Sequence, residues 1–165
     1  TDTRLYLHYN VKRLPAEVLL DGIDDAAGTQ ERFAGVPLGT RAISLPDSNF
    51  ASYFLDTTGR PQRVIACECE RTSTPNLAAV LHLLNGDVVQ RKLTDKNNRI
   101  AGFITNKTSV EDAIRELYLV TFSRYPTDDE VETAAAFADT AESPRQGLED
   151  ILWALINSRE FLFNH

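Results

Sequence analysis

Three helix starts follow one another in the last third of the chain, and they constrain its fold more than any other feature of the sequence. Each is a Ser or Thr with an acidic or amide residue three positions later, and they stand at Ser109, Thr127 and Ser143. In such a capping box the hydroxyl accepts a hydrogen bond from a backbone N–H that the first helical turn leaves without a partner. An apolar stripe with helical spacing follows each start. We therefore expect three antiparallel helices joined by short turns.

The middle helix of these three is rich in alanine between residues 132 and 141. Small side chains allow close approach by neighbouring helices, so we expect it to be the tightly packed one. Further upstream, Thr74-Pro75 predicts another helix that ends at Asn85-Gly86, and a second short helix is expected over residues 87–93. The polar residues 94–98 then break the pattern, and we expect them to form an exposed loop.

The first part of the chain carries fewer helix signals. Leu14-Pro15-Ala16-Glu17 predicts a helix start, because proline fits the opening turn and glutamate fits the positive end of the helix dipole, and Gly28 predicts the end. Beyond Gly28, Gly and Pro interrupt every candidate element, and short extended pieces are expected at 41–45 and 63–66. The predicted fold class is mainly α, a helical bundle-like domain with an irregular segment and room for short strands before residue 70.

Length and charge limit the classes of protein that the chain can belong to. Its 165 residues fit one helix-rich domain, which we divide into an irregular and helical lobe (1–73) and a helical core (74–165). The net charge of -7 repels phosphate backbones and anionic headgroups, so we expect no nucleic-acid partner. The apolar runs are too short for membrane insertion. The chain begins without methionine or a signal peptide, and we interpret it as a segment of a larger parent protein.

A charged cluster around two cysteines is the candidate for chemistry. It consists of Arg60, Arg63, Cys67, Glu68, Cys69, Glu70 and Arg71. Two thiols one residue apart could hold a soft metal or form a redox pair. Only three histidines, His8, His82 and His165, could complete a zinc site, and a disulfide across so small a ring would be strained. The residues favour a structural interpretation, in which the cysteines are buried and bidentate ion pairs brace the loop against the helix that begins at Pro75.

Catalytic motifs are missing from the sequence. It contains no Gly-x-Ser-x-Gly, no phosphate-binding glycine loop and no His-Glu-x-x-His motif. The segment Cys67-Glu68-Cys69 also lacks the Cys-x-x-Cys-His pattern that attachment of c-type haem requires. We therefore assign no catalytic residue, no metal ligand and no cofactor to this segment.

The C-terminal stretch is unusually aromatic for a chain end. It contains Trp153, Phe161 and Phe163. We expect most of this stretch to belong to the core, while these aromatic side chains could also dock a neighbouring domain.

Four blocks of sequence, in their order and spacing, resemble a planctomycete-specific C-terminal domain of unknown function from large exported bacterial proteins. The blocks are residues 13–17 with 20–23, residues 59–71 with 81–86, residues 124–127 and residues 153–165. Their most specific pieces are Cys67–Arg71 and Leu155–Leu162, and the resemblance covers nearly the whole chain. It implies export to the periplasm or cell surface. It also implies a parent protein that carries a second planctomycete-type domain and often a cytochrome-c-like domain, to which any haem would belong.

Three hypotheses of function follow from these observations. The leading one is a non-catalytic interaction or scaffold module that packs on other domains of an exported, redox-associated bacterial protein. The alternative is saccharide binding, metal binding or a catalytic contribution at Cys67–Arg71, with Tyr53, Phe54 and Trp153 lining a cleft and Glu68 or Glu70 as acid or base. The third is a docking surface for a cytochrome, which the net charge would steer.

Overall fold

A computed structural model describes residues 11–61, 81, 83 and 86–164 of the chain. These residues are mainly helical, which confirms the predicted fold class. The α-helices are α1 (Ala16–Ala27), α2 (Tyr53–Thr57), α4 (Asp87–Leu93), α5 (Arg99–Asn106), α6 (Val110–Phe122), α7 (Asp128–Ala138), α8 (Pro144–Ile156) and α9 (Arg159–Leu162). A 3-10 helix η2 (Ala42–Ser44) and two short strands, β1 (Lys12–Arg13) and β2 (Phe163–Asn164), complete the described elements.

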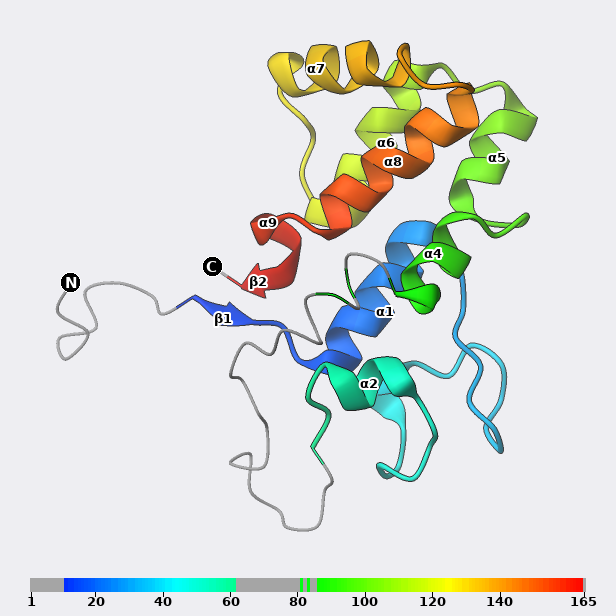
Figure 1. The fold of residues 1–165 in the computed structure, drawn as a ribbon, viewed down its shortest axis with the longest axis vertical. Coiled ribbons are helices and arrows are strands. Elements are labelled where there is room, and N and C mark those ends of the chain that lie inside the picture. Colours follow the sequence, from blue (N-terminus) through cyan, green and yellow to red (C-terminus); the bar gives the residue numbers. More distant parts are fainter. Residues whose placement is uncertain (1–10, 62–80, 82, 84–85, 165) are drawn as a thin grey trace, which may run out of the picture.

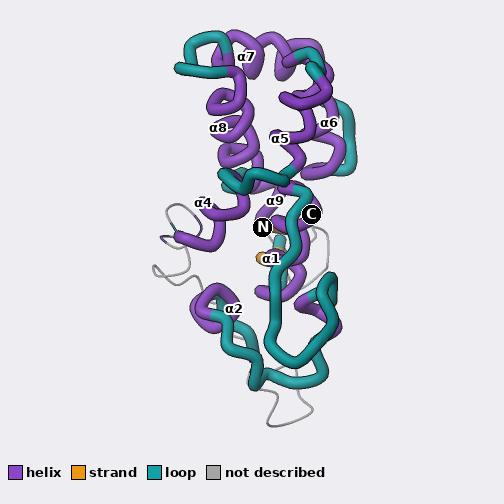
Figure 2. Tube along the Cα trace, turned by 90° about the vertical axis from the view of Figure 1, so that its right-hand side faces the viewer, coloured by secondary structure: helices purple, strands orange, loops and turns teal. Residues whose placement is uncertain are grey.

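The helices are arranged around α1 at one end of the molecule and around α6 and α8 at the other (Figures 1 and 2). Helices α2 and α4 and the element η2 contact α1, while α5 contacts both α1 and α8. The two strands are antiparallel, with Arg13 opposite Phe163. The backbone N–H of Leu14 also donates to the carbonyl of Leu162 over 2.9 Å. The beginning and the end of the described chain therefore lie side by side.

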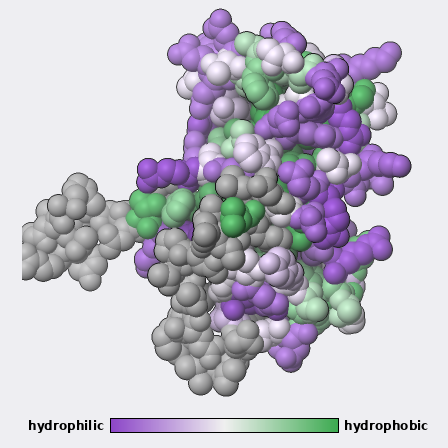
Figure 3. All heavy atoms as spheres, in the orientation of Figure 1, coloured by the Kyte–Doolittle hydropathy of each residue, from purple (hydrophilic) through white to green (hydrophobic). Residues whose placement is uncertain are grey.

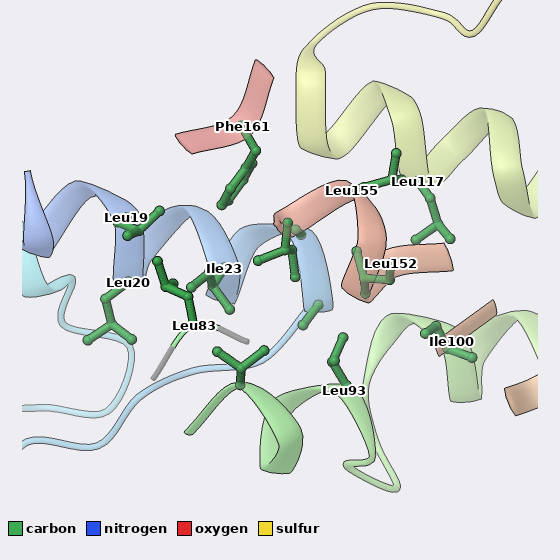
Figure 4. Packing of buried hydrophobic residues seen from close by; sticks show 14 of the residues in the cluster. Leu19, Leu20, Ile23, Leu83, Leu93, Ile100, Leu117, Leu152, Leu155 and Phe161 are labelled. Atoms are coloured by element: carbon green, nitrogen blue, oxygen red, sulfur yellow. The ribbon is translucent and has the colours of Figure 1, made fainter. Parts of the chain in front are cut away.

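Helix α1 has the boundaries that the sequence predicts. Pro15 precedes its first residue, and Gly28 ends it in a left-handed conformation with φ of 70°, which glycine adopts without a steric penalty. Its apolar side chains Leu19, Leu20 and Ile23 are fully buried. Figure 4 shows them together with leucines of α4 and α8, which belong to the same hydrophobic cluster.

The segment 41–45 was predicted to be extended, and this prediction is wrong because it contains η2. The cause is a distant side chain: the carboxylate of Asp21 accepts hydrogen bonds from the backbone N–H groups of Ala42, at 2.7 Å, and Ile43, at 3.1 Å. These bonds satisfy donors that the first turn of a helix leaves without a partner. The other predicted extended piece, 63–66, lies outside the described residues, as does most of the helix predicted from Thr74.

Helix α4 is confirmed over Asp87–Leu93, and residues 94–97 of the loop after it are exposed as predicted, with Asn98 as the exception. Asn98 is buried instead of exposed. Its side chain accepts from the backbone N–H of Ala101 over 2.9 Å and so caps α5, a helix that the sequence analysis did not predict. The amide group of Asn98 also donates to the backbone carbonyls of Lys92 and Leu93, which joins the end of α4 to the start of α5.

The three predicted helix starts of the last third are confirmed. Ser109 and Ser143 each accept from the backbone N–H three residues later, and Thr127 forms a full reciprocal capping box with Glu130. The helices α6, α7 and α8 all contact one another. Their arrangement departs from three antiparallel neighbours, because α7 lies across α6 and α8 (Figure 1).

The prediction that the alanine-rich helix is tightly packed is wrong. Only Val131 and Ala138 are buried in α7. Close approach occurs at one point, where a Cβ atom added to Gly147 of α8 would lie 2.9 Å from the Cα of Ala138. Ala134 and Ala135, in the middle of α7, are only partly buried against the core, and most other residues of the helix are exposed.

Candidate functional site

Of the charged cluster predicted around the two cysteines, the structure places only Arg60. Its side chain is buried, and its guanidinium donates to the carboxylate of Asp56 over 2.6 Å and to the carbonyl of Phe50 over 2.8 Å. Arg60 therefore anchors the chain that follows α2. The other members lie outside the described residues, and so do the three histidines: Arg63, Cys67, Glu68, Cys69, Glu70, Arg71, His8, His82 and His165. Their roles stay predictions.

The three aromatic residues predicted for docking have separate positions. Phe161 is 7% exposed and its ring lies against Gly22 of α1, pointing into the core (Figure 4). Phe163 is half-buried in β2. Trp153 of α8 is half-buried and lines a groove. Phe161 is thus a core residue and offers no docking surface of its own, while Trp153 belongs to one.

This groove, which we call the α7 groove, lies between α6, α7 and α8 and has a volume of about 680 Å³. Most of its lining is apolar or aromatic, with polar groups on α7 and at Asp150. The lining residues are Tyr118, Asp129, Glu130, Thr133, Ala134, Phe137, Asp150, Ile151, Trp153, Ala154 and Leu155. Figure 3 shows apolar surface among hydrophilic residues at the end of the molecule where Figure 1 places α7. Phe137, which the sequence analysis did not single out, is 50% exposed.

The groove exists because α7 is held at its two ends. At its C-terminal end Ala138 meets Gly147, with no room for a larger residue than glycine. At its N-terminal end the capping box of Thr127 and Glu130 fixes the first turn. Between these points Ala134 and Ala135 are only partly buried. The two attachments therefore hold α7 above α8 and leave the groove open.

A cluster around Arg124 strengthens the attachment at the N-terminal end. The guanidinium forms bidentate pairs with Glu130 of α7, at 2.9 Å, and with Glu160 of α9, at 2.6 and 2.9 Å. It also donates to the carbonyl of Tyr125 over 3.2 Å. Every N–H of the guanidinium thus has an acceptor, a geometry that lysine cannot reproduce. The Arg124 cluster, meaning Arg124, Glu130 and Glu160, ties the end of α6 to α7 and α9.

Two aromatic rings contact the Arg124 cluster, and the pKa values of several of its groups are shifted. The guanidinium carbon of Arg124 lies 5.5 Å from the ring centres of Tyr118 and Phe122, within the range of a cation–π contact. The hydrogen bonds from Arg124 lower the pKa of Glu130 to about 2, and those from Glu130 and Glu160 raise the pKa of Arg124. Burial raises the pKa of Tyr118. Glu130 and Arg124 therefore stay charged and Tyr118 stays neutral near neutral pH, so the cluster holds structure and offers no group suited to proton transfer.

The rim of the groove is acidic. Asp129 of α7 and Asp150 of α8 are exposed and line the groove from opposite walls. Among the described residues, no lysine or arginine lines it. Arg124 neutralises only one of the two charges of Glu130 and Glu160, so the local potential, with these two aspartates, is negative.

A second polar cluster lies beside α1, and the sequence analysis missed it. The buried ammonium of Lys92 binds Asp24 at 2.6 Å and Glu31 at 2.9 Å. Asp24 also accepts from the hydroxyl of Thr29 over 2.7 Å and from the backbone N–H of Glu31 over 3.0 Å. A small polar hollow of about 200 Å³ opens beside Lys92, whose ammonium is already paired with these two carboxylates. The cluster joins α1, α4 and the loop after α1, which is a structural role.

The signal for this cluster was present in the sequence. Glu17, Asp21 and Asp24 recur at helical spacing along α1, and all three are buried. Carboxylates are rarely buried without a partner, so such a stripe indicates hidden cations or backbone donors. Within the part of the chain that the structure describes, no group of three or more metal-binding side chains comes together, and no helix is long and apolar enough to span a membrane.

The comparison with protein families identifies a family for this chain. The model of the family described as "PSD1: Protein of unknown function (DUF1553)" matches residues 1–138, which end with the last residue of α7. Helix α8, the other wall of the groove, follows the matched region. No curated protein and no solved structure matches the chain. Since the match covers most of the sequence, the chain belongs to the PSD1 family, a family of unknown function.

Proposed function

We propose that the chain is a non-catalytic interaction module of an exported bacterial protein, in which another domain of the same protein docks in the α7 groove. One observation carries this proposal: an apolar groove with half-exposed aromatic side chains lies between α7 and α8, and only two of the eleven residues of α7 are buried by the described chain. A helix with one apolar side is normally stabilised by packing that side against a neighbour. A docked domain would supply the missing neighbour.

The chemistry of the lining favours a protein partner over a small polar ligand. Aromatic residues such as Trp153, Tyr118 and Phe137 are typical of the centre of protein interfaces. A saccharide needs hydrogen-bonding groups all around its ring, whereas apolar and aromatic residues outnumber the four polar ones in this lining. The groove therefore gives no support to the saccharide alternative, which rests on Cys67–Arg71 outside the described residues.

The context of the module is taken from the resemblance to planctomycete-specific domains. It supports a parent protein exported to the periplasm or cell surface, with a second planctomycete-type domain as the partner. Where the parent also carries a cytochrome-c-like domain, haem belongs to that domain, and we propose no cofactor for this segment. The cytochrome itself is the less favoured partner.

Association between this chain and the remainder of its parent, produced as a second polypeptide, tests the proposal by isothermal titration. Phe137→Ser should weaken binding by about tenfold or more, because truncating an aromatic at the centre of an interface has a large effect. The matched control is Leu38→Ser, since Leu38 is 64% exposed and lies away from the α7 groove. Equal binding by the two variants would remove the groove from the interface and contradict the proposal.

A further inference from the structure

We infer that the α7 groove receives an amphipathic helix whose apolar face is flanked by lysine or arginine. The inference rests on the proposed function and narrows it to a class of partner element. Three features of the groove support it: the helical spacing of its walls, the small residues along them, and the acidic side chains on its rim.

The lining of the groove follows helical spacing on both walls. On α7 the lining residues Glu130, Thr133, Ala134 and Phe137 form a stripe at i, i+3, i+4 and i+7. On α8 the stripe consists of Asp150, Ile151, Ala154 and Leu155. An occupant helix that follows the stripe of α7 would cross α8, as helices that pack ridges into grooves do. The eleven residues of α7 span about 16 Å, so the occupant would be about three helical turns long.

The small residues in the lining make the groove wide enough for a helix, and not only for a single side chain. Ala134 and Ala154 stand on opposite walls and are followed on each wall by a larger residue, Phe137 and Leu155. Alanine positions allow a helix backbone to come close, while the larger side chains fit between its apolar residues. An occupant with Leu or Phe at i, i+3, i+4 and i+7 would therefore complete the packing.

The acidic side chains on the rim of the groove favour basic residues on both sides of the occupant's apolar face. Asp129 lies in the first turn of α7, where a carboxylate also stabilises the helix dipole, so it is partly explained by the fold. Asp150 lies in the middle of α8, where the dipole gives no such explanation. Neither forms an ion pair with another described residue, and the whole chain carries a net charge of -7. A basic flank on the occupant would neutralise both aspartates and speed its association.

The same charges disfavour a second copy of this chain as the occupant. Two copies joined through the groove would bring Asp129 and Asp150 of one near those of the other, together with two net charges of -7. We therefore expect the chain to be monomeric in sedimentation equilibrium. A dimer that Phe137→Ser dissociates would assign the groove to a second copy and overturn the inference.

Three synthetic helical peptides of about twelve residues provide the probe. They share the same Leu and Phe positions and differ in having Lys, Gln or Glu on the flanks. The sequence contains a single tryptophan, Trp153, which lines the groove, so its fluorescence reports binding of peptides that lack tryptophan. The Lys peptide should bind about tenfold or more tighter than the Glu peptide, and about 0.5 M salt should reduce this difference.

Two pairs of substitutions separate the local charge from the total charge. Asp129→Asn with Asp150→Asn should reduce the preference for the Lys peptide by about tenfold and leave binding of the Gln peptide unchanged. Asp47→Asn with Asp95→Asn changes the total charge equally, at exposed positions outside the groove, and should preserve the preference.

The outcomes distinguish this inference from the proposed function. Equal affinity for the Lys and Glu peptides, or no binding of any peptide, overturns the inference, while the effect of Phe137→Ser on association with the parent still decides the proposed function. A loss of preference in both double variants would show a nonspecific charge effect and would also overturn the inference. A preference lost only with Asp129 and Asp150 supports it.

Discussion

Helices α1 and α7 are nearly equal in length, but most residues of α1 are buried and most residues of α7 are not. Nine of the twelve residues of α1 are buried, including three carboxylic acids, whereas two of the eleven residues of α7 are buried. Helix α1 has neighbours around it, including η2, α2, α4 and α6. Helix α7 packs mainly on α6 and α8, and most of its residues are exposed. The comparison indicates that α1 is the central helix of the core, while α7 packs on the core and exposes most of its side chains.

The ion-pair clusters beside the two helices also differ in burial, and the cluster beside α1 is the more buried one. Lys92 beside α1 has a side chain that is 7% exposed, while the side chain of Arg124 at the start of α7 is 38% exposed. Charges removed from water must be paired, because an unpaired buried charge costs several kcal/mol. Half-exposed pairs contribute much less, since water screens them. Removing a charge should therefore destabilise the chain more beside α1 than beside α7.

The largest effect is expected for Lys92→Met. The substitution keeps an apolar stem of similar length and leaves the carboxylates of Asp24 and Glu31 without their cation, so the free energy of unfolding should fall by about 3 kcal/mol. Urea denaturation measures it. Lys96→Met is the control, because Lys96 is exposed and should change stability by less than about 0.5 kcal/mol. Similar small losses in both variants would contradict the contrast between the two clusters.

A smaller effect is expected where α7 touches α8. Gly147→Ala would place its Cβ 2.9 Å from the Cα of Ala138, and backbone atoms there must move. Overpacking of this kind costs up to about 3 kcal/mol, and the better helix propensity of alanine returns about 1, so a loss of about 2 kcal/mol is expected.

The control for Gly147→Ala is Gly102→Ala in α5. A Cβ added to Gly102 would meet no other atom within 4 Å, so the substitution should raise the melting temperature through helix propensity alone. Equal stabilisation by the two substitutions would show that α7 is not fixed at Ala138.

Local hydrogen bonds explain which elements the sequence could predict. The starts of α6, α7 and α8 depend on Ser109, Thr127 and Ser143, each of which caps its own helix, and the end of α1 depends on Gly28. These interactions span a few residues and leave a pattern in the sequence. The start of α5 also depends on a local cap, Asn98, so this helix could have been predicted from the same rule.

Contacts between distant residues explain what the sequence could not predict. The helix η2 depends on Asp21, which is twenty-one positions before Ala42. The exposure of α7 depends on how it crosses α8, and its alanine stripe is equally compatible with tight packing and with an open groove. For that reason Trp153 could be proposed for docking from composition, whereas Phe137 became a candidate only when the groove was found.

The Arg124 cluster should make stability depend on pH. The pKa of Glu130 is lowered from 4.5 to about 2 in the folded chain, so the unfolded chain binds the proton more readily. Its contribution is complete above about pH 5 and is lost as the pH falls from 4.5 towards 2. Because the pair is about one third exposed, we expect a loss of about 1 kcal/mol. Acid titrations of urea stability should show this component, and Glu130→Gln should lack it.

The control for this pH dependence is Glu132→Gln, because Glu132 is exposed on the same helix and no ion pair of it is found among the described residues. It should keep the acid component of the native chain. If Glu130→Gln and Glu132→Gln follow the same pH profile, the Arg124 cluster does not hold the first turn of α7, and the groove must be kept open by Ala138 and Gly147 alone.

The smallest effect on stability is expected at the centre of the α7 groove. Phe137 is half exposed, and serine has nearly the same helix propensity as phenylalanine, so Phe137→Ser should change the free energy of unfolding by less than about 0.5 kcal/mol. Urea denaturation beside the native chain measures this. A core aromatic provides the contrast, since Phe54→Ser removes a ring that is 1% exposed and should be strongly destabilising. A loss above about 1 kcal/mol in Phe137→Ser would mean that Phe137 stabilises the fold, as the residues of α1 do. A neutral result, combined with loss of binding, would separate the residues that hold this chain together from those that it offers to a partner.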